Sequence, residues 1–174
     1  LLGVTTKDPS RIFLATSSGQ FEPPVGTNHP AADHLDDGPL LVFDADGDGA
    51  NDLLITRSGA ALPEGAPAYQ PALLLNDGHG QFRPAASGAL PTLPLSAGAA
   101  AAADFDHDGR LDLFVGARVR PKQYPLPPRS ALLINRGGRF EDVTDELAPG
   151  LREIGMVTSA LWSDVDGDGW VDLL

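Results

Sequence analysis

The sequence alternates between short apolar runs and polar turns rich in glycine, proline and aspartate. The apolar runs contain leucine, valine, isoleucine or phenylalanine, as in residues 40–43, 53–56 and 113–117. Runs of this length and composition are typical of buried β-strands. The 16 prolines and 20 glycines interrupt the chain too often for long helices. We expect a single helical turn at residues 145–148, and the sequence as a whole predicts an all-β fold.

The apolar runs recur in a fixed order with a period of about 60 residues. Each unit has a strand before an acidic loop, a second strand after it, a third after a longer connection and a fourth after a glycine-containing hairpin. The expected first strands are residues 40–43, 99–103 and 159–162, the second 53–56 and 113–117, the third 72–75 and 131–134, and the fourth 81–83 and 139–142. Four short antiparallel strands per repeat predict the blades of a β-propeller.

Three similar hairpins support this period, at residues 11–21, 72–82 and 131–140. Each returns through a phenylalanine that we expect to anchor the fourth strand in the core, and these are Phe21, Phe82 and Phe140. The small residues of the run 99–103 suit a narrow first strand where neighbouring blades crowd together.

The pattern D-x-D-x-D-G-x-x-D-L occurs three times, and we name its copies the first loop (residues 44–52), the second loop (104–112) and the third loop (164–172). Four carboxylates within nine residues repel one another unless a cation lies among them. Ca²⁺ resolves this because it takes roughly 6 to 8 oxygen ligands and tolerates irregular geometry. Glycine at the sixth position allows the chain to turn sharply around the ion.

The pattern assigns ligands by position within each loop. The first, third, fifth and ninth positions would supply side-chain oxygens, from Asp44, Asp46, Asp48 and Asp52, from Asp104, Asp106, Asp108 and Asp112, and from Asp164, Asp166, Asp168 and Asp172. The seventh position has no common chemistry, which fits a backbone carbonyl ligand from Ala50, Arg110 or Trp170. We therefore expect about three Ca²⁺ ions per chain.

Two alternatives to a calcium loop between strands are an EF-hand and an acidic turn without metal. An EF-hand needs a glutamate at its twelfth position between two helices, but Ile55 and Val115 stand there and strands are expected on both sides. An acidic turn without metal is less consistent with three regular copies. A second acidic group, which includes His29, His34 and Asp37, is interpreted as a polar connection between blades rather than as another metal site.

The repeat divides the chain into parts of one partial β-propeller. Residues 1–34 would end a first blade, residues 35–94 and 95–154 would form two whole blades, and residues 155–174 would begin a fourth. Propellers close with about 4 to 8 blades, so about three blade-equivalents do not form a ring. We expect a piece of a longer polypeptide or a part of a larger assembly, with a ring of several copies as the alternative.

Charge and composition exclude several classes of protein. Twelve lysines and arginines against 24 aspartates and glutamates give a net charge of −12, and no basic cluster is dense enough for nucleic acid. The chain has no cysteine, hence no disulfide or thiolate metal site. No apolar run reaches the roughly 18 to 20 residues of a transmembrane segment. Calcium loops favour an extracellular, cell-surface or periplasmic location, where calcium is plentiful.

The three acidic loops and the Asn-x-Gly-x-Gly-x-Phe hairpin resemble the FG-GAP/VCBS repeats of integrin-alpha-type β-propellers. Residues 112–118, 138–144 and 155–164 further resemble bacterial VCBS-repeat proteins of the group that often carries an ASPIC/UnbV (CRTAC-like) domain. The resemblance implies a calcium-stabilised, secreted or surface-exposed scaffold for adhesion through protein or glycan contacts. All twelve loop aspartates keep the family pattern, whereas the opening 30 residues match it weakly.

We expect a binding or structural module without catalytic activity, because the four histidines (His29, His34, His79 and His107) share no setting with a nucleophile. Trp162 and Trp170 are interpreted as packing beside a calcium loop rather than as a sugar-stacking face. The alternatives are the propeller portion of a secreted carbohydrate- or lipid-active enzyme and an accessory subunit of a surface or membrane-associated complex.

Overall fold

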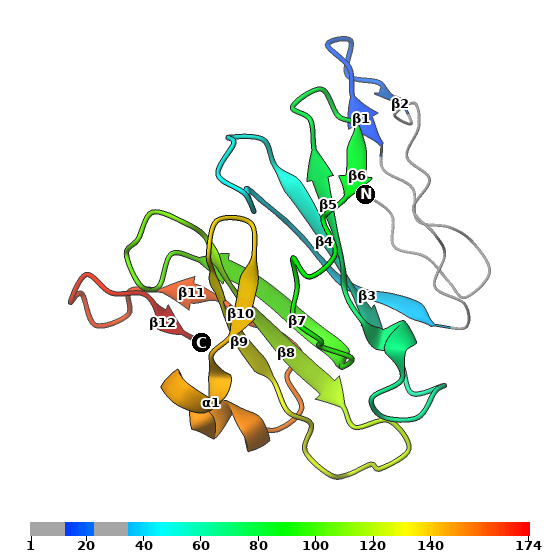
Figure 1. Ribbon diagram of the computed structural model, residues 1–174, viewed down its shortest axis with the longest axis vertical. Coiled ribbons are helices and arrows are strands. Elements are labelled where there is room, and N and C mark those ends of the chain that lie inside the picture. Colours follow the sequence, from blue (N-terminus) through cyan, green and yellow to red (C-terminus); the bar gives the residue numbers. More distant parts are fainter. Residues whose placement is uncertain (1–12, 23–34) are drawn as a thin grey trace.

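The computed structural model describes residues 13–22 and 35–174 as two four-stranded antiparallel sheets flanked by two small ones (Figure 1). The first sheet contains β3 (Asp36–Phe43), β4 (Asp52–Ser58), β5 (Ala72–Asn76) and β6 (Phe82–Pro84). The second contains β7 (Ser96–Ala103), β8 (Asp112–Val119), β9 (Ala131–Asn135) and β10 (Phe140–Asp142). Both sheets follow the order of the sequence, so the predicted all-β fold with antiparallel sheets is confirmed.

The two small sheets are two-stranded. One pairs β1 (Leu14–Ala15) with β2 (Phe21–Glu22), and the other pairs β11 (Trp162–Ser163) with β12 (Asp172–Leu173). The expected first strand at residues 159–162 is therefore shorter and later than predicted. Residues 11 and 12 of the first hairpin lie outside the described residues.

Helical structure is confined to single turns among the described residues. The turn expected at residues 145–148 is α1 (Thr144–Leu147), which continues into the 3₁₀ helix η2 (Pro149–Glu153). A further 3₁₀ turn, η1 (Pro67–Tyr69), lies in the connection from β4 to β5. No helix in this part of the chain is both long and apolar enough to cross a membrane.

Strand register repeats between the two large sheets. Leu53 of β4 pairs with Leu74 of β5, and Leu113 of β8 pairs with Leu133 of β9. Leu53 and Leu113 each come directly after an acidic loop, so the two loops enter their sheets in the same register. The repeat found in the sequence is therefore a repeat in three dimensions.

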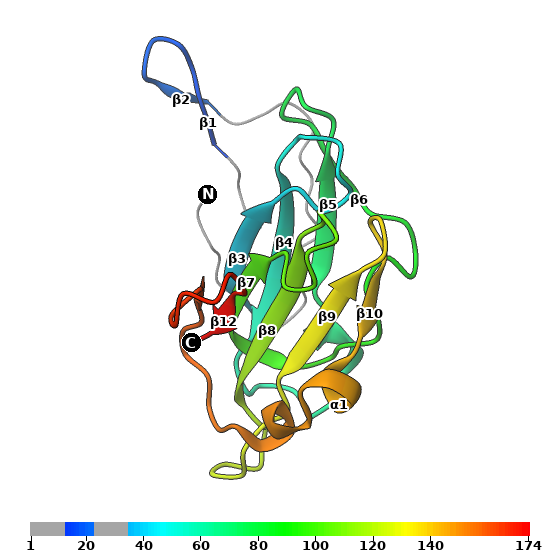
Figure 2. The ribbon, with the colours of Figure 1, turned by 90° about the vertical axis from the view of Figure 1, so that its left-hand side faces the viewer.

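The first strand of the second sheet packs against the first sheet, where β7 contacts β3 and β4 (Figure 2). Ala97, Ala100 and Ala102 of β7 pack in the core that the two sheets share, so small side chains let the sheets approach, as the alanine run predicted. Side chains of both sheets form the core between them, including Leu54, Leu133 and the edge-to-face pair Phe43 and Phe140, whose ring centroids are 6.2 Å apart. Leu53 and Ile55 face a smaller cluster on the other side of β4.

The three hairpin phenylalanines differ in burial. Phe140 is 2% exposed and joins the core, and Phe82 packs on the smaller cluster. Phe21 is 70% exposed, so its predicted place in the core is wrong. Phe140 and Phe82 belong to four-stranded sheets with neighbours to cover them, whereas β2 belongs to a two-stranded sheet whose described surroundings do not cover its aromatic ring.

Two glycines let the segment after η2 cross the second sheet. A Cβ atom at Gly98 would lie 2.1 Å from the carbonyl oxygen of Val157, and one at Gly116 would lie 2.5 Å from its Cγ1 atom. The backbone amide of Val157 donates to the carbonyl of Ala117 at 2.9 Å. This close crossing leads the chain to β11 and the third loop.

Truncation of the fully buried Leu54 tests the packing between the sheets. We expect Leu54→Ala to lower the free energy of unfolding by about 2 to 5 kcal/mol, because it leaves a cavity between the two sheets. Leu161→Ala is the matched control, since that side chain is 62% exposed, and its expected change is within about 0.5 kcal/mol. Urea denaturation measures both values, and equal losses would contradict the assignment of the core.

Candidate metal centres

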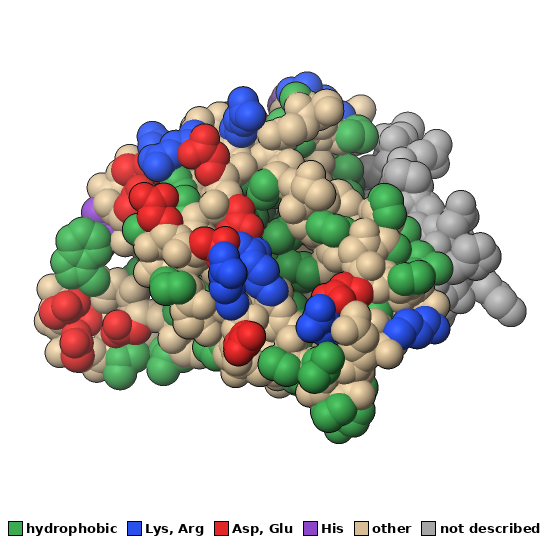
Figure 3. Space-filling model, turned by 60° about the horizontal axis from the view of Figure 1, so that its bottom comes forward, with side chains coloured by type: hydrophobic (Ala, Val, Ile, Leu, Met, Phe, Trp, Pro, Cys, Tyr) green, Lys and Arg blue, Asp and Glu red, His purple; other side chains and the backbone are tan. Residues whose placement is uncertain are grey.

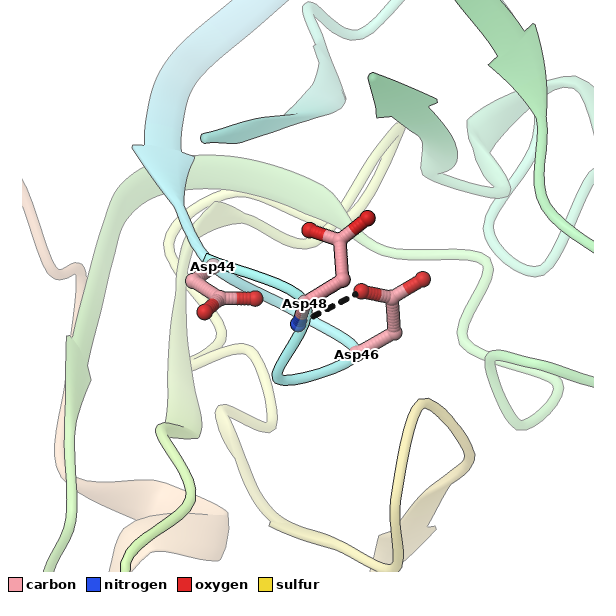
Figure 4. A group of neighbouring side chains, drawn as sticks. All are labelled: Asp44, Asp46 and Asp48. Atoms are coloured by element: carbon pink, nitrogen blue, oxygen red, sulfur yellow. Dashed lines mark hydrogen bonds between the residues drawn. The ribbon is translucent and has the colours of Figure 1, made fainter. Parts of the chain in front are cut away.

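In each acidic loop, three carboxylates converge on one point. The ligand atoms of each group lie within 4.8 Å of one another, and the groups are Asp44, Asp46 and Asp48, then Asp104, Asp106 and Asp108, then Asp164, Asp166 and Asp172. Figure 4 shows the three carboxylates of the group in the first loop, around its turn. Hard oxygen donors at this spacing fit Ca²⁺ better than they fit a soft metal.

The aspartate at the first position organises its loop by accepting hydrogen bonds from backbone amides. Asp44 accepts from Gly47 at 2.7 Å and from Gly49 at 3.0 Å. Asp104 and Asp164 accept from the sixth-position glycines, Gly109 and Gly169, at 2.9 and 3.0 Å. The carboxylate at the start of each loop is therefore held in place by the backbone of its own loop.

The tight turn uses left-handed backbone at the fourth and sixth positions. The sixth-position glycines have φ between 86° and 91°, and the fourth position is Gly47, His107 or Gly167. His107 has φ of 59°, and its exposed ring stacks on Trp170 of the third loop at a centroid distance of 4.1 Å. This contact joins His107 of the second loop to the third loop.

The ninth-position aspartates of the first two loops have another setting. Asp52 and Asp112 are 1% and 0% exposed. Asp52 accepts from the amides of Ala45 and Asn76, each at 2.8 Å. Asp112 accepts from the amides of Phe105 at 3.2 Å and of Asn135 at 2.8 Å. These carboxylates tie each loop to the third strand of its sheet.

Burial raises the pKa of Asp52 and Asp112 above the usual range of an aspartate, although their backbone hydrogen bonds lower it. The nearby carboxylates at the third and fifth positions raise the pKa further. Desolvated negative charge beside like charge is the environment that a bound cation would stabilise. The donor set therefore fits a divalent ion.

The predicted ligands are thus only partly brought together. In the third loop the ninth-position Asp172 lies in the cluster, in place of Asp168. At the seventh position, the amides of Ala50, Arg110 and Trp170 donate to the fifth-position aspartate at 2.8 to 3.0 Å. Their carbonyl groups, and the ninth-position carboxylates of the first two loops, remain predicted ligands. Of the second acidic group, Asp37 forms an ion pair with Arg57, and both histidines lie outside the described residues.

Two asparagines at the end of the third strand belong to these centres, although their role was not predicted. The side chain of Asn76 donates to the carbonyl of Asn51 at 3.0 Å, and that of Asn135 donates to the carbonyl of Leu111, also at 3.0 Å. Each asparagine thereby contacts the eighth position of its own loop. The presence of an asparagine at this position in both hairpins is the signal in the sequence that points to this role.

Both tryptophans pack against the second loop, as expected. Trp162 stacks on Phe105 with ring centroids 5.9 Å apart and an interplanar angle of 13°. Trp170 stacks on His107 and is 51% exposed. The third loop and the strand before it are therefore attached to the second loop by two aromatic contacts.

At the opposite end of the large sheets, the connections from the second to the third strand line a cleft of about 390 Å³, together with residues 92–95 of the connection between the sheets (Figure 3). Acidic and basic side chains lie next to one another on this face. Arg120 donates to both carboxylate oxygens of Glu64 at 2.7 and 2.8 Å, which joins the connection of one sheet to that of the other. On the other wall, Arg129 pairs with Asp142 at 2.9 Å.

Comparison with known proteins agrees with the geometry of the loops. No curated protein matches the chain. The family model of the FG-GAP-like repeat matches residues 44–115, which extend from the first ligand position of the first loop into β8. Repeats of this family are β-propeller-like and often bind Ca²⁺. The match supports the predicted resemblance to the FG-GAP repeat family for this part of the chain.

Proposed function

We propose that this chain is a calcium-stabilised, non-catalytic scaffold of an extracytoplasmic protein, which mediates contacts with protein or glycan partners. Its four-stranded sheets would be blades of a β-propeller that further blades complete, in a protein of the bacterial VCBS-repeat group with ASPIC/UnbV relatives. The observation that carries the proposal is the convergence of three carboxylates in each of three equivalent loops. About three ions would then bind per chain.

The ion would be a structural element in this proposal. Each loop joins the first strand of a sheet to the second, so a bound cation would hold these strands together at their turn. Anything that binds the folded state and not the unfolded chain stabilises the fold, by about 2.7 kcal/mol at one hundred times the dissociation constant. Extracellular calcium would keep sites of modest affinity filled.

The proposed contact surface is the cleft at the other end of the sheets. Most of its lining comes from connections between strands, at residues 64–65, 92–95, 120–121 and 128–129, and the rest comes from the ends of β7, β8 and β10. Connections of this kind carry binding residues in many proteins because a rigid scaffold positions them. Of the described histidines, His79 is exposed in a hairpin and His107 stacks on Trp170, so neither is placed for catalysis in this cleft.

Removal of one ligand tests the calcium sites. Asp106→Ala should reduce the stoichiometry measured by calorimetry from about three ions to about two. We expect a melting temperature in calcium that is about 5 to 10 °C lower, because one structural ion is lost, and a much smaller difference in chelator. Glu153→Ala removes an exposed acid outside the loops and should change neither value. Unchanged stoichiometry and melting in Asp106→Ala would refute the assignment of ligands.

The cleft can be tested with panels of immobilised glycans and extracellular proteins in calcium. A ligand that the native protein retains should bind at least about tenfold more weakly to Arg120→Glu, because that change reverses one charge on the cleft wall and breaks the pair with Glu64. Arg83→Glu makes the same charge change on β6, outside the residues that line the cleft. Equal losses in the two variants would contradict a contact surface in the cleft.

The contribution of Asp142, on one wall of the cleft, to the stability of the fold should depend on pH. Burial alone would raise the pKa of Asp142, but hydrogen bonds from Arg129 and Thr144 lower it below the usual range. Its charged form therefore stabilises the fold above the unfolded pKa of about 3.8, and this stability is lost as the pH falls through the lower folded value. We expect Asp142→Asn to be less stable than the native protein by about 1 kcal/mol at pH 7, since the partly exposed pair is screened by solvent.

This difference should shrink as the pH falls below about 3.8, and urea denaturation across that range measures it. Glu141→Gln is the matched control, because Glu141 pairs with Arg136 only at 3.5 Å and both side chains are exposed. A difference for Asp142→Asn that persists unchanged in acid would show that its charge is not the cause.

A further inference from the structure

A buried row of hydrogen bonds runs from the first loop to the second. In the first loop, Asp52 accepts from the amide of Ala45, whose carbonyl accepts from the side-chain amide of Asn135 at 2.9 Å. The backbone amide of Asn135 donates to Asp112 of the second loop at 2.8 Å. The row therefore joins the ninth-position aspartates of two loops that are 60 residues apart in the sequence.

Every group in this row is shielded from water. Ala45 and Asp112 are 0% exposed, and Asp52 and Asn135 are 1% exposed. Removing the hydrogen-bond partner of an amide buried in this way destabilises the folded protein, because no water molecule replaces the missing bond. The bonds of Asn135 to both loops therefore persist only while both loops keep their positions.

Direct packing reinforces the same connection. The hairpin after Asn135 lies against the first loop, since a Cβ atom at Gly138 would be 3.1 Å from the Cβ atom of the ligand Asp46. Asn135 also holds this hairpin, because its side-chain oxygen accepts from the amide of Gly138 at 2.8 Å. Ordering of the first loop thus orders the hairpin, and the hairpin in turn holds the eighth and ninth positions of the second loop.

We propose that Asn135 couples the metal centres of the first and second loops, so that an ion bound in one raises the affinity of the other. This inference rests on the proposed binding of Ca²⁺. The first ion would order the contacts that the two loops share, and the second would bind to a loop already in place. Asn135 is a positioning residue in this proposal, because it acts through Ala45 and Asp112 rather than on the ion.

The chain supplies a matched control in Asn76. This residue occupies the same hairpin position in the first sheet, donates to its own loop at Asn51 and binds Asp52 through its backbone amide. Its hydrogen bonds in the described part of the chain reach no second acidic loop. Ala15 occupies the equivalent place in the hairpin of β1 and β2, so alanine is compatible with this turn.

Calcium titrations followed by nuclear magnetic resonance can resolve each loop. The amides of Gly49, Gly109 and Gly169 donate to the first aspartate of their loops and report on them separately. In the native background, Asp106→Asn should raise the calcium concentration at the midpoint of the Gly49 titration by about fivefold or more. A factor of about five is the lower end of the usual range of coupling between sites. Because coupling between two sites is reciprocal, Asp46→Asn should also shift the midpoint at Gly109 to higher calcium.

In the Asn135→Ala background, Asp106→Asn should move the midpoint at Gly49 by less than about twofold, whereas the Asn76→Ala background should keep the full shift. Equal shifts in both backgrounds would overturn the role of Asn135. The absence of any shift in the native background would overturn the coupling, even if Asn135→Ala fails to fold. If no amide responds to calcium in the native protein, the proposed metal sites themselves fail, and that result is distinct from independent binding at each loop.

Discussion

Repulsion among the carboxylates of each acidic loop is the constraint on which the rest of this structure depends. The fold brings three negative groups within 4.8 Å in a turn that must also connect two strands. Backbone amides compensate part of this charge, as those of Gly47 and Gly49 do for Asp44. Two neutral donors do not offset the whole charge of three carboxylates, so a cation placed among them would stabilise the turn.

The second loop contains a partial substitute for such a cation. The guanidinium group of Arg110 forms an ion pair with Asp108 and also donates to the carbonyl of Asn135 at 2.9 Å. The equivalent positions in the other loops are Ala50 and Trp170, which carry no charge. A variable seventh position therefore changes the electrostatics of a loop without changing its backbone, and the three centres need not have equal affinity.

The sequence predicted the features that depend on neighbouring residues, and it did not predict those that depend on contacts between distant parts of the chain. Strands such as β4 and β8, the turns at Gly49 and Gly109 and the helical turn at α1 are local features, and their residues alone indicate them. The exposure of Phe21 was not predicted, because burial depends on the strands that surround a residue rather than on its own hairpin. The bond from Asn135 to Ala45 joins residues 90 positions apart, and a single sequence contains no signal for that contact.

The two ends of the sheets have different physical requirements. At the end with the acidic loops, the positions of side chains are fixed by the turn, the glycines and the hydrogen bonds to the third strand. At the other end, the connections are joined by partly exposed ion pairs such as Glu64 with Arg120, which are individually weak and can be rearranged at little cost. In the proposed calcium-bound protein, an ion that fixes one end of a sheet would limit the movement of its strands, and the cleft at the far end would keep its shape without strong contacts of its own. The weak bonding of the cleft is therefore compatible with a defined surface, because its rigidity would come from the sheets and from the ion-bound loops at their other end.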